Sequence, residues 1–190
     1  IGFPDSVSEE NFGEYALGNC TALTSIRLPS SWTRVPEGLL WGNTSMTSWE
    51  IPEGIVSIGE NAFRDSALES VTLPSTLQTI GNYAFHGSQI TEVTIPGSVT
   101  EIEAFAFSEC DSLRTVVLES GVTTLKGISF AYCDSLEEVV IPDSVADISA
   151  AAFYGSNPGK LHISCSAGSQ AAEFAEAVTY VYSDYSGVPE

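Results

Sequence analysis

The sequence predicts a repeat solenoid made mainly of β-strands. One pattern recurs along almost the whole chain: Leu-x-x-Val-x-Leu-Pro, then two aliphatic residues three positions apart, then Ala-Phe followed closely by Ser or Cys. Successive phenylalanines of this pattern are 22, 22, 23 and 23 residues apart, at Phe63, Phe85, Phe107, Phe130 and Phe153. A unit this short cannot bury its apolar side chains alone, so such units stack and bury them between neighbours.

Each unit opens with an alternating segment that we expect to form a strand. Val71 and Leu73 share one face of such a strand, and Ser70 and Thr72 share the other. The corresponding inward pairs are Ile26/Leu28, Trp49/Ile51, Val93/Ile95, Val116/Leu118, Val139/Ile141 and Leu161/Ile163. Proline follows and ends the strand, because it has no N–H to donate to a ladder. These prolines are Pro29, Pro52, Pro74, Pro96 and Pro142, and Glu119 takes the remaining place.

The second side of each unit carries two inward aliphatic residues and then a turn. The pairs are Ile55/Ile58, Leu77/Ile80, Val99/Ile102, Val122/Leu125 and Val145/Ile148. Gly59 and Gly81 follow two of these pairs, where we expect a turn with positive φ. We place Trp41 at the head of the phenylalanine column. A column of small residues comes next, expected at Cys20, Thr44, Ser66, Ser88, Cys110, Cys133 and Ser156.

The repeat predicts a single domain over residues 1–190. Residues 1–22 form a degenerate first coil or the edge of a longer array, with Phe12 or Leu17 in the aromatic place, and about six repeats fill 23–163. Residues 164–182 are expected to cap the stack with a helix and a closing strand, since Ser169 is a suitable helix N-cap and alanines follow it. Residues 183–190 have the composition of a tail.

Charge excludes several classes of partner. Lys and Arg number 6 against 25 Asp and Glu, for a formal net charge of −19. Such a surface repels nucleic acid and anionic membranes, so the acidity is expected to serve solubility. No apolar run approaches the ~20 residues of a membrane span, and the start does not resemble a signal peptide. The chain begins at Ile1 rather than Met, which indicates a mature form or an excised segment.

The four cysteines do not indicate a zinc site, because Cys-x-x-Cys spacing is absent and only two histidines accompany them. Three of them, Cys20, Cys110 and Cys133, fall in the small-residue column, which favours buried thiols. Cys110 and Cys133 should stack about 4.8 Å apart by strand spacing. That separation permits a disulfide, although side chains in register would lie wider than the usual ~3.8 Å between Cβ atoms.

These combined motifs resemble the BspA-like bacterial leucine-rich repeat family over about residues 20–182, the Gly-Ser-x-Ala-x-x-Phe-Ala segment at 168–175 included. The resemblance implies a right-handed, gently curved coil with a parallel sheet on one side and short strands or 3-10 turns on the other. It also implies a secreted or surface-attached protein of host-associated bacteria that takes part in adhesion. The chain departs from the pattern at Glu119 and at Trp32, Trp41, Met46 and Trp49; we interpret Trp41 and Trp49 as packing residues rather than sugar platforms.

The outer face of the parallel sheet is the expected binding surface, because rigid strands hold side chains at fixed spacing. One outward column reads Arg27, Glu50, Thr72, Thr94, Val117, Val140, His162, and the adjacent one reads Ser25, Ser48, Ser70, Glu92, Thr115, Glu138, Lys160. Thr and Val are also simply good strand formers, which is the alternative explanation. The candidate ligand-binding residues are Ser70, Thr72, Glu92, Thr94, Thr115, Val117, Glu138 and Val140.

None of the other candidate residues indicates a catalytic, metal-binding or glycosylation site. His86 lies in a variable column and is interpreted as a surface residue, and with His162 in a distant coil we expect no Ser-His or Cys-His pair. Asp111 and Asp134 occupy equivalent turns, but no dense Asp/Asn/Gly loop of the calcium-binding type surrounds them. Two Asn-x-Ser/Thr acceptor sequences, at Asn19 and Asn43, coincide with the small-residue turn, so the repeat explains them without glycosylation. Motifs for nucleotide, hydrolase or metalloprotease chemistry are absent from the sequence.

The sequence therefore predicts a non-catalytic protein-binding or adhesion module, without cofactor or metal, outside the cell or on its surface. Its expected partner is a host or neighbouring surface protein, with a glycan as a further option, and the chain itself is expected to be a monomer. The alternative from a different class is a structural spacer that positions other domains. For either role the convex side remains an alternative contact surface to the exposed sheet.

Overall fold

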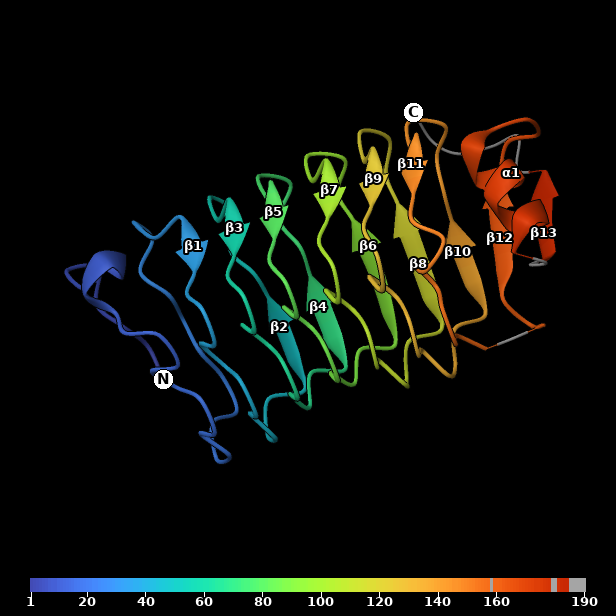
Figure 1. Ribbon diagram of the computed structural model, residues 1–190. Coiled ribbons are helices and arrows are strands. Elements are labelled where there is room, and N and C mark those ends of the chain that lie inside the picture. Colours follow the sequence, from blue (N-terminus) through green and yellow to red (C-terminus); the bar gives the residue numbers. More distant parts are fainter. Residues whose placement is uncertain (158, 179–180, 185–190) are drawn as a thin grey trace.

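The computed structural model describes residues 1–157, 159–178 and 181–184, and these form a stack of coils along one axis (Figure 1). The first regular element is the short 3-10 helix η1 (Glu9–Asn11), and the elements that follow it are strands up to the C-terminal helix. One side of the stack is a parallel sheet of six two-residue strands. In order these are β1 (Arg34–Val35), β3 (Ser57–Ile58), β5 (Thr79–Ile80), β7 (Glu101–Ile102), β9 (Thr124–Leu125) and β11 (Asp147–Ile148).

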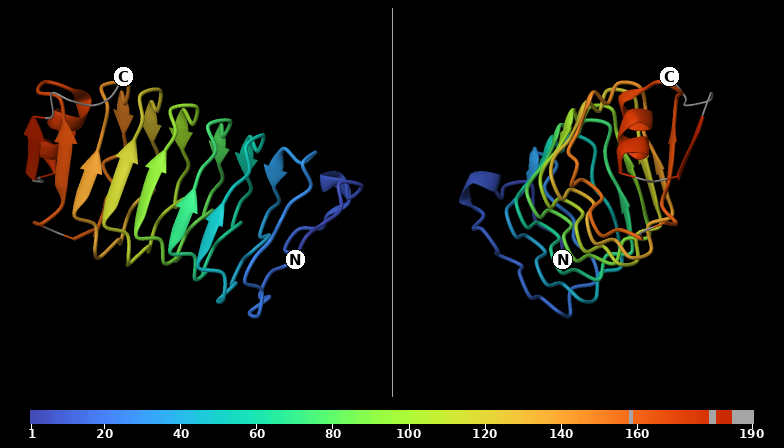
Figure 2. Two further views of the ribbon diagram at one scale, coloured as in Figure 1. Left: turned by 180° about the vertical axis from the view of Figure 1, so that it is seen from behind. Right: turned by 45° about the vertical axis from the view of Figure 1, so that its right-hand side comes forward.

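The other side carries the longer strands, and Figure 2 shows them in one row along the stack. A two-stranded parallel sheet joins β2 (Ser48–Glu50) to β4 (Ser70–Thr72). A five-stranded parallel sheet then runs β6 (Glu92–Ile95), β8 (Thr115–Leu118), β10 (Glu138–Val140), β12 (His162–Cys165) and β13 (Val181–Asp184). The predicted β-solenoid, with its longer parallel sheet opposite short strands, is confirmed.

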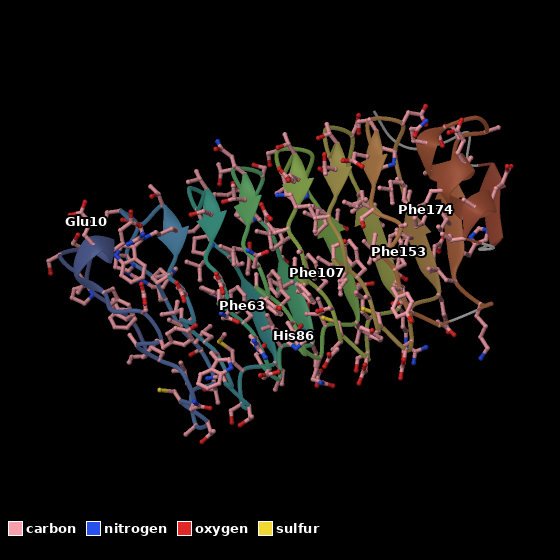
Figure 3. All side chains as sticks on the ribbon, viewed as in Figure 1. Glu10, Phe63, His86, Phe107, Phe153 and Phe174 are labelled. Atoms are coloured by element: carbon pink, nitrogen blue, oxygen red, sulfur yellow. The ribbon has the colours of Figure 1, made fainter. Side chains whose placement is uncertain are left out.

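The phenylalanine column forms the centre of the core (Figure 3). Phe63, Phe85, Phe107, Phe130 and Phe153 are fully buried, and their rings stack nearly parallel from coil to coil. Their centroids are separated by 4.8, 4.9, 5.2 and 5.6 Å in that order. These distances follow the spacing of parallel strands, because each coil repeats the backbone of the one before.

The coil before Phe63 has a register that the sequence pattern assigned incorrectly. Leu40, which is fully buried, donates its N–H to Ala62, just as Phe63 donates to Ala84, so Leu40 and not Trp41 heads the aromatic column. Asn43 likewise takes the small-residue place that was assigned to Thr44. The reason is that Gly38 and Gly42 occupy the two left-handed positions of this coil, with φ of 58° and 63°, and they fix what faces inward between them.

Gly59 and Gly81 do lie in turns, but not for the predicted reason, because neither is among the residues with positive φ. A Cβ on Gly59 would lie 2.7 Å from the backbone nitrogen of Glu37, and one on Gly81 would lie 2.8 Å from that of Glu60. Both residues are therefore glycine because the backbone of the preceding coil approaches them closely. The left-handed positions fall instead two and six residues later, at Asn61 and Asp65 in the first of these coils.

The last coil differs from the predicted register by two residues. Val139 pairs with Ile163, Glu138 with His162, and Val140 with Ser164, so His162 and Lys160 do not continue the two outward columns as expected. Leu161 is buried but is not the partner of Val139. The turn after Ser156, in which Asn157 and Gly159 are left-handed, is longer than the repeat pattern predicts. The Asn157 side-chain amide holds this turn to the preceding coil by donating to the Leu136 carbonyl.

A helix and a strand cover the C-terminal side of the stack. Helix α1 (Gln170–Ala177) begins after Ser169, whose hydroxyl accepts the Ala172 N–H as predicted, and Phe174 lies 6.0 Å from Phe153 between ring centroids. Strand β13 extends to Asp184, into the segment predicted as tail, and residues 185–190 lie outside the described part of the chain. At the other end Trp32 is buried with Phe3 and Phe12 against it, which makes it a packing residue.

Candidate functional site

The row of longer strands is interrupted at one point, between β4 and β6. Strand β4 is the last strand of the two-stranded sheet and β6 the first of the five-stranded sheet, so neither has a ladder partner on its facing edge. On the opposite side of the same coils β5 and β7 are paired, which keeps the stack continuous. The two strands stay adjacent, because the Thr91 N–H just before β6 donates to the Glu69 carbonyl just before β4 at 3.0 Å, so this opening is a local loss of ladder bonds in one wall of the solenoid.

Core side chains beside this opening are more exposed than those of the next coil. Val71 and Leu73 are half-buried, whereas their counterparts Val93 and Ile95 in the next coil are buried. A hollow of about 440 Å³ lies over the opening. It is lined by Ser70, Val71, Thr72, Leu73, Glu92, Val93, Thr94, Pro96, Thr115, Val117 and Glu119.

The hollow brings together six of the eight candidate residues from the sequence. Ser70, Thr72, Glu92, Thr94, Thr115 and Val117 line it, and Ser70, Thr72, Glu92 and Thr94 among them are exposed. The other two candidates lie on the next strand of the same face, because Glu138 pairs with Thr115 and Val140 with Val117. The Glu138 carboxylate there accepts a hydrogen bond from the Ser164 hydroxyl at 3.2 Å.

Glu119 is a site residue that the search for outward columns missed. It occupies the place of the repeat proline, and its carboxylate accepts the Gly97 N–H from the preceding coil at 3.2 Å while it lines the hollow. The sequence did contain a signal, since Glu119 is the single acidic residue in a column of prolines. Departures from a repeat often mark functional positions.

The chemistry of the hollow is acidic and aliphatic. Two carboxylates, Glu92 and Glu119, and four hydroxyls surround the aliphatic side chains, and no Lys, Arg or His is among the lining residues. A second, shallower hollow of about 420 Å³ lies next along the face between Ile26 and Thr72, and it includes Arg27 and Glu50. The site can therefore accept hydrogen-bond donors and positive charge over an apolar floor.

His86 is not the surface residue that the variable column suggested: it is 9% exposed, and its Nδ1 lies 2.7 Å from the Ser108 hydroxyl oxygen. Its Nε2 lies 3.8 Å from a Glu109 carboxylate oxygen, so the structure does bring a serine, a histidine and an acid together. The sequence pattern did not predict this group, because His86 lies one coil before Ser108 and Glu109. Burial lowers the pKa of His86, and Arg64 adds to this, against the opposing charges of Glu109 and Asp65.

This group does not have the geometry of a nucleophilic site. The Ser108 hydroxyl donates to the Phe105 carbonyl at 3.1 Å, and Ser108 is 1% exposed. The ring nitrogen Nδ1 must then supply the proton of the bond to Ser108, which leaves no base beside the hydroxyl. A substrate also cannot reach a buried oxygen, so the three residues hold two coils together instead.

Cys110 and Cys133 are both thiols, and no disulfide joins them. Both are fully buried, and their thiols lie 3.1 Å from the Phe85 carbonyl and 3.2 Å from the Phe107 carbonyl, respectively. Burial raises the pKa of Cys110 to about 12 and raises that of Cys133 well above the ordinary value. Thiols in this state are poor nucleophiles and metal ligands.

The acidic turns do not assemble into a metal centre. Burial first, then the charges of Asp134 and Glu109, raises the pKa of Asp111, as expected for aspartates in stacked turns. Among the described residues, however, no group of three or more His, Cys, Asp or Glu side chains is arranged to hold a metal ion. In that part of the chain there is also no helix with the length and apolarity that a bilayer crossing requires.

The family model for the BspA type leucine rich repeat region matches this chain in six copies, over residues 1–42 and 37–160. Curated proteins yield no match. Among solved structures, the pneumococcal vaccine antigen PcpA is similar at 17% identity, with a TM-score of 0.65 over 98% of this chain and 42% of that one.

Two leucine-rich repeat proteins are also similar in structure. One from Bacteroides ovatus has 19% identity and a TM-score of 0.54 over 97% of this chain and 65% of that one. One from Eubacterium ventriosum has 20% identity and a TM-score of 0.51 over 87% and 59%. At these identities the likeness concerns the fold, and the chain spans less than two thirds of the length of each of these structures.

Proposed function

The chain belongs to the BspA-type leucine-rich repeat family, and from that premise we propose that it is a non-catalytic protein-binding module of a secreted or surface-exposed bacterial protein. The observation that carries the proposal is the opening between β4 and β6, where the solenoid leaves core side chains half-exposed under a rim of polar groups. Partly exposed apolar groups rimmed by polar ones are typical of protein interaction sites.

A location outside the cell is part of the same proposal. The vaccine-antigen description of one structural neighbour supports it, as does the net charge of −19, which favours solubility. Adhesion is one form that such binding can take. A non-catalytic role is supported by the buried state of the Ser108 hydroxyl and of the Cys110 and Cys133 thiols.

The proposal is tested by filling the hollow. Thr94 is exposed on β6 and lines the hollow, so Thr94→Tyr should place a ring in it without loss of a buried group. Binding of extracellular-matrix and bacterial surface proteins would be measured on the immobilised chain, and we expect Thr94→Tyr to weaken it by about tenfold or more. Thr79→Tyr, at an exposed strand position in the hollow on the opposite side, is the matched control. Binding that is equal in both variants would place the contact elsewhere.

A structural spacer is the second candidate, and the uninterrupted stack of phenylalanine rings supports it because it makes the rod rigid. A spacer requires length and not surface chemistry. If the chain is a spacer, a larger protein that contains it should keep its function with Thr94→Tyr. Removal of coils should abolish that function.

A further inference from the structure

The hollow between β4 and β6 has a charge that selects its partner. Its two ionisable lining residues, Glu92 and Glu119, are both acidic and exposed. The Gly97 N–H contacts one oxygen of Glu119, but this neutral donor leaves the negative charge in place. The two carboxylates lie at opposite ends of their strands, because Glu92 pairs with Thr115 and Ile95 with Leu118, so Glu119 is four positions further along, about 13 Å by strand rise. One positive charge on a ligand can therefore pair with one carboxylate, and a ligand needs two such charges to pair with both.

The cations of the chain do not neutralise this site. Arg64 pairs with Asp65, Arg114 with Glu137, and Lys126 with Glu101 and Glu103. Arg34 donates to the Glu9 carbonyl, and none of the six Lys or Arg residues lines the hollow. With a formal net charge of −19, the rest of the molecule adds a field of the same sign and attracts cations toward the site.

The floor of the hollow matches the rest of a long basic side chain. Val71 and Leu73 present half-buried aliphatic surface below the carboxylates, and no aromatic ring is among the lining residues. Lys and Arg carry an aliphatic stem that packs on apolar surface and a charged tip that remains in a polar rim. A sugar would instead find no ring on which to stack, so the chemistry favours a protein ligand.

The positions of the two carboxylates favour an extended ligand. An extended chain advances about 3.3 Å per residue, so basic residues four positions apart are separated by about the distance between Glu92 and Glu119. The residues between them would lie over Thr94 and Val117, which line the hollow between the two carboxylates. We propose that the hollow binds an extended, positively charged protein segment whose Lys or Arg side chains pair one with Glu92 and another with Glu119. This inference rests on the proposed function and names its partner class.

The test uses three short peptides that differ at one residue type: valine alternates with lysine, with glutamine or with glutamate. Titration of the full chain is expected to give a dissociation constant at least about tenfold lower for the lysine peptide than for the glutamine peptide. The glutamate peptide should not bind, and added salt should weaken the lysine peptide selectively.

Two double variants with the same change in net charge locate the effect. Glu92→Gln with Glu119→Gln should abolish the preference for lysine over glutamine, and the amide oxygen introduced by Glu119→Gln can still accept the Gly97 N–H. Glu14→Gln with Glu60→Gln, beside the opposite sheet, should retain the preference. A preference that survives in the first variant, or equal binding of the lysine and glutamine peptides, would overturn the charge assignment while protein binding at the hollow stands. If no peptide binds, but whole proteins bind and Thr94→Tyr blocks them, the hollow is a protein-binding site whose partner is not an extended basic segment. If neither the peptides nor the whole proteins bind, the proposed function and this inference are both wrong.

Discussion

At the scale of single residues, two left-handed positions in each coil from Gly38 to Tyr132 decide how the turns are built. One column holds Gly38, Asn61, Tyr83, Phe105 and Ile128, all with φ between 55° and 63°. This conformation costs bulky residues about 1–2 kcal/mol each. Stacking offsets part of that cost, since the rings of Tyr83 and Phe105 lie 4.6 Å apart and the Arg64 guanidinium lies 5.2 Å from the Tyr83 ring centroid.

His86 predicts acid sensitivity at this scale. Its pKa is lowered in the folded protein, chiefly by burial, so below about pH 6.5 the unfolded chain binds more protons than the folded one. The free energy of unfolding should therefore fall as the pH drops from about 7.5 to about 5. His86→Gln keeps a hydrogen-bonding side chain for Ser108 and should reduce this fall, as measured by chemical denaturation at both pH values. An identical fall in the variant would mean that the carboxylates alone cause it.

At the scale of elements, the sequence was sufficient wherever apolar side chains repeat and insufficient where turns change length. The inward pairs on the longer strands and the phenylalanine stack follow from periodicity, because each of these side chains must enter the same core. The Trp41 and Lys160–His162 assignments failed because one glycine pair and one longer turn displaced the register. Within the candidate site, the outward residues were predictable, but the break between β4 and β6 is a property of neighbouring backbones that no single coil encodes.

The close approach between coils makes Gly81 a sensitive position. A Cβ at Gly81 would meet the Glu60 backbone nitrogen at 2.8 Å, so Gly81→Ala must push two coils apart and should cost about 1–3 kcal/mol of unfolding free energy. Gly127 is the matched control, because its φ is not in the left-handed region and its nearest contact would be the Ser149 hydroxyl oxygen at 3.4 Å. Gly127→Ala should change stability by no more than about 1 kcal/mol. Equal losses in urea denaturation would show that backbone proximity is not what requires glycine at position 81.

At the scale of the whole molecule, the coils are separable units that share one core. Each coil contacts its neighbours through the same ring stack and the same ladders, so stability should increase with the number of coils. The hollow, in contrast, depends on three consecutive strands, β4, β6 and β8, since its lining consists of residues in these strands or directly after them. The two candidate functions therefore make opposite demands on the length of the stack.

Removal of the neighbouring coil, none of whose residues lines the hollow, separates these demands. Deletion of residues 126–148 joins Leu125 to Ser149, which is an equivalent join because Leu125 pairs with Ile148 in the short-strand sheet. Phe107 and Phe153 then become neighbours in the ring stack. The shortened protein should fold with a lower free energy of unfolding, as one coil interface is lost, yet bind the lysine peptide with an unchanged dissociation constant. Loss of binding in a protein whose circular dichroism still shows the β-rich fold would mean that the contact surface extends beyond the hollow onto β10, which the deletion removes.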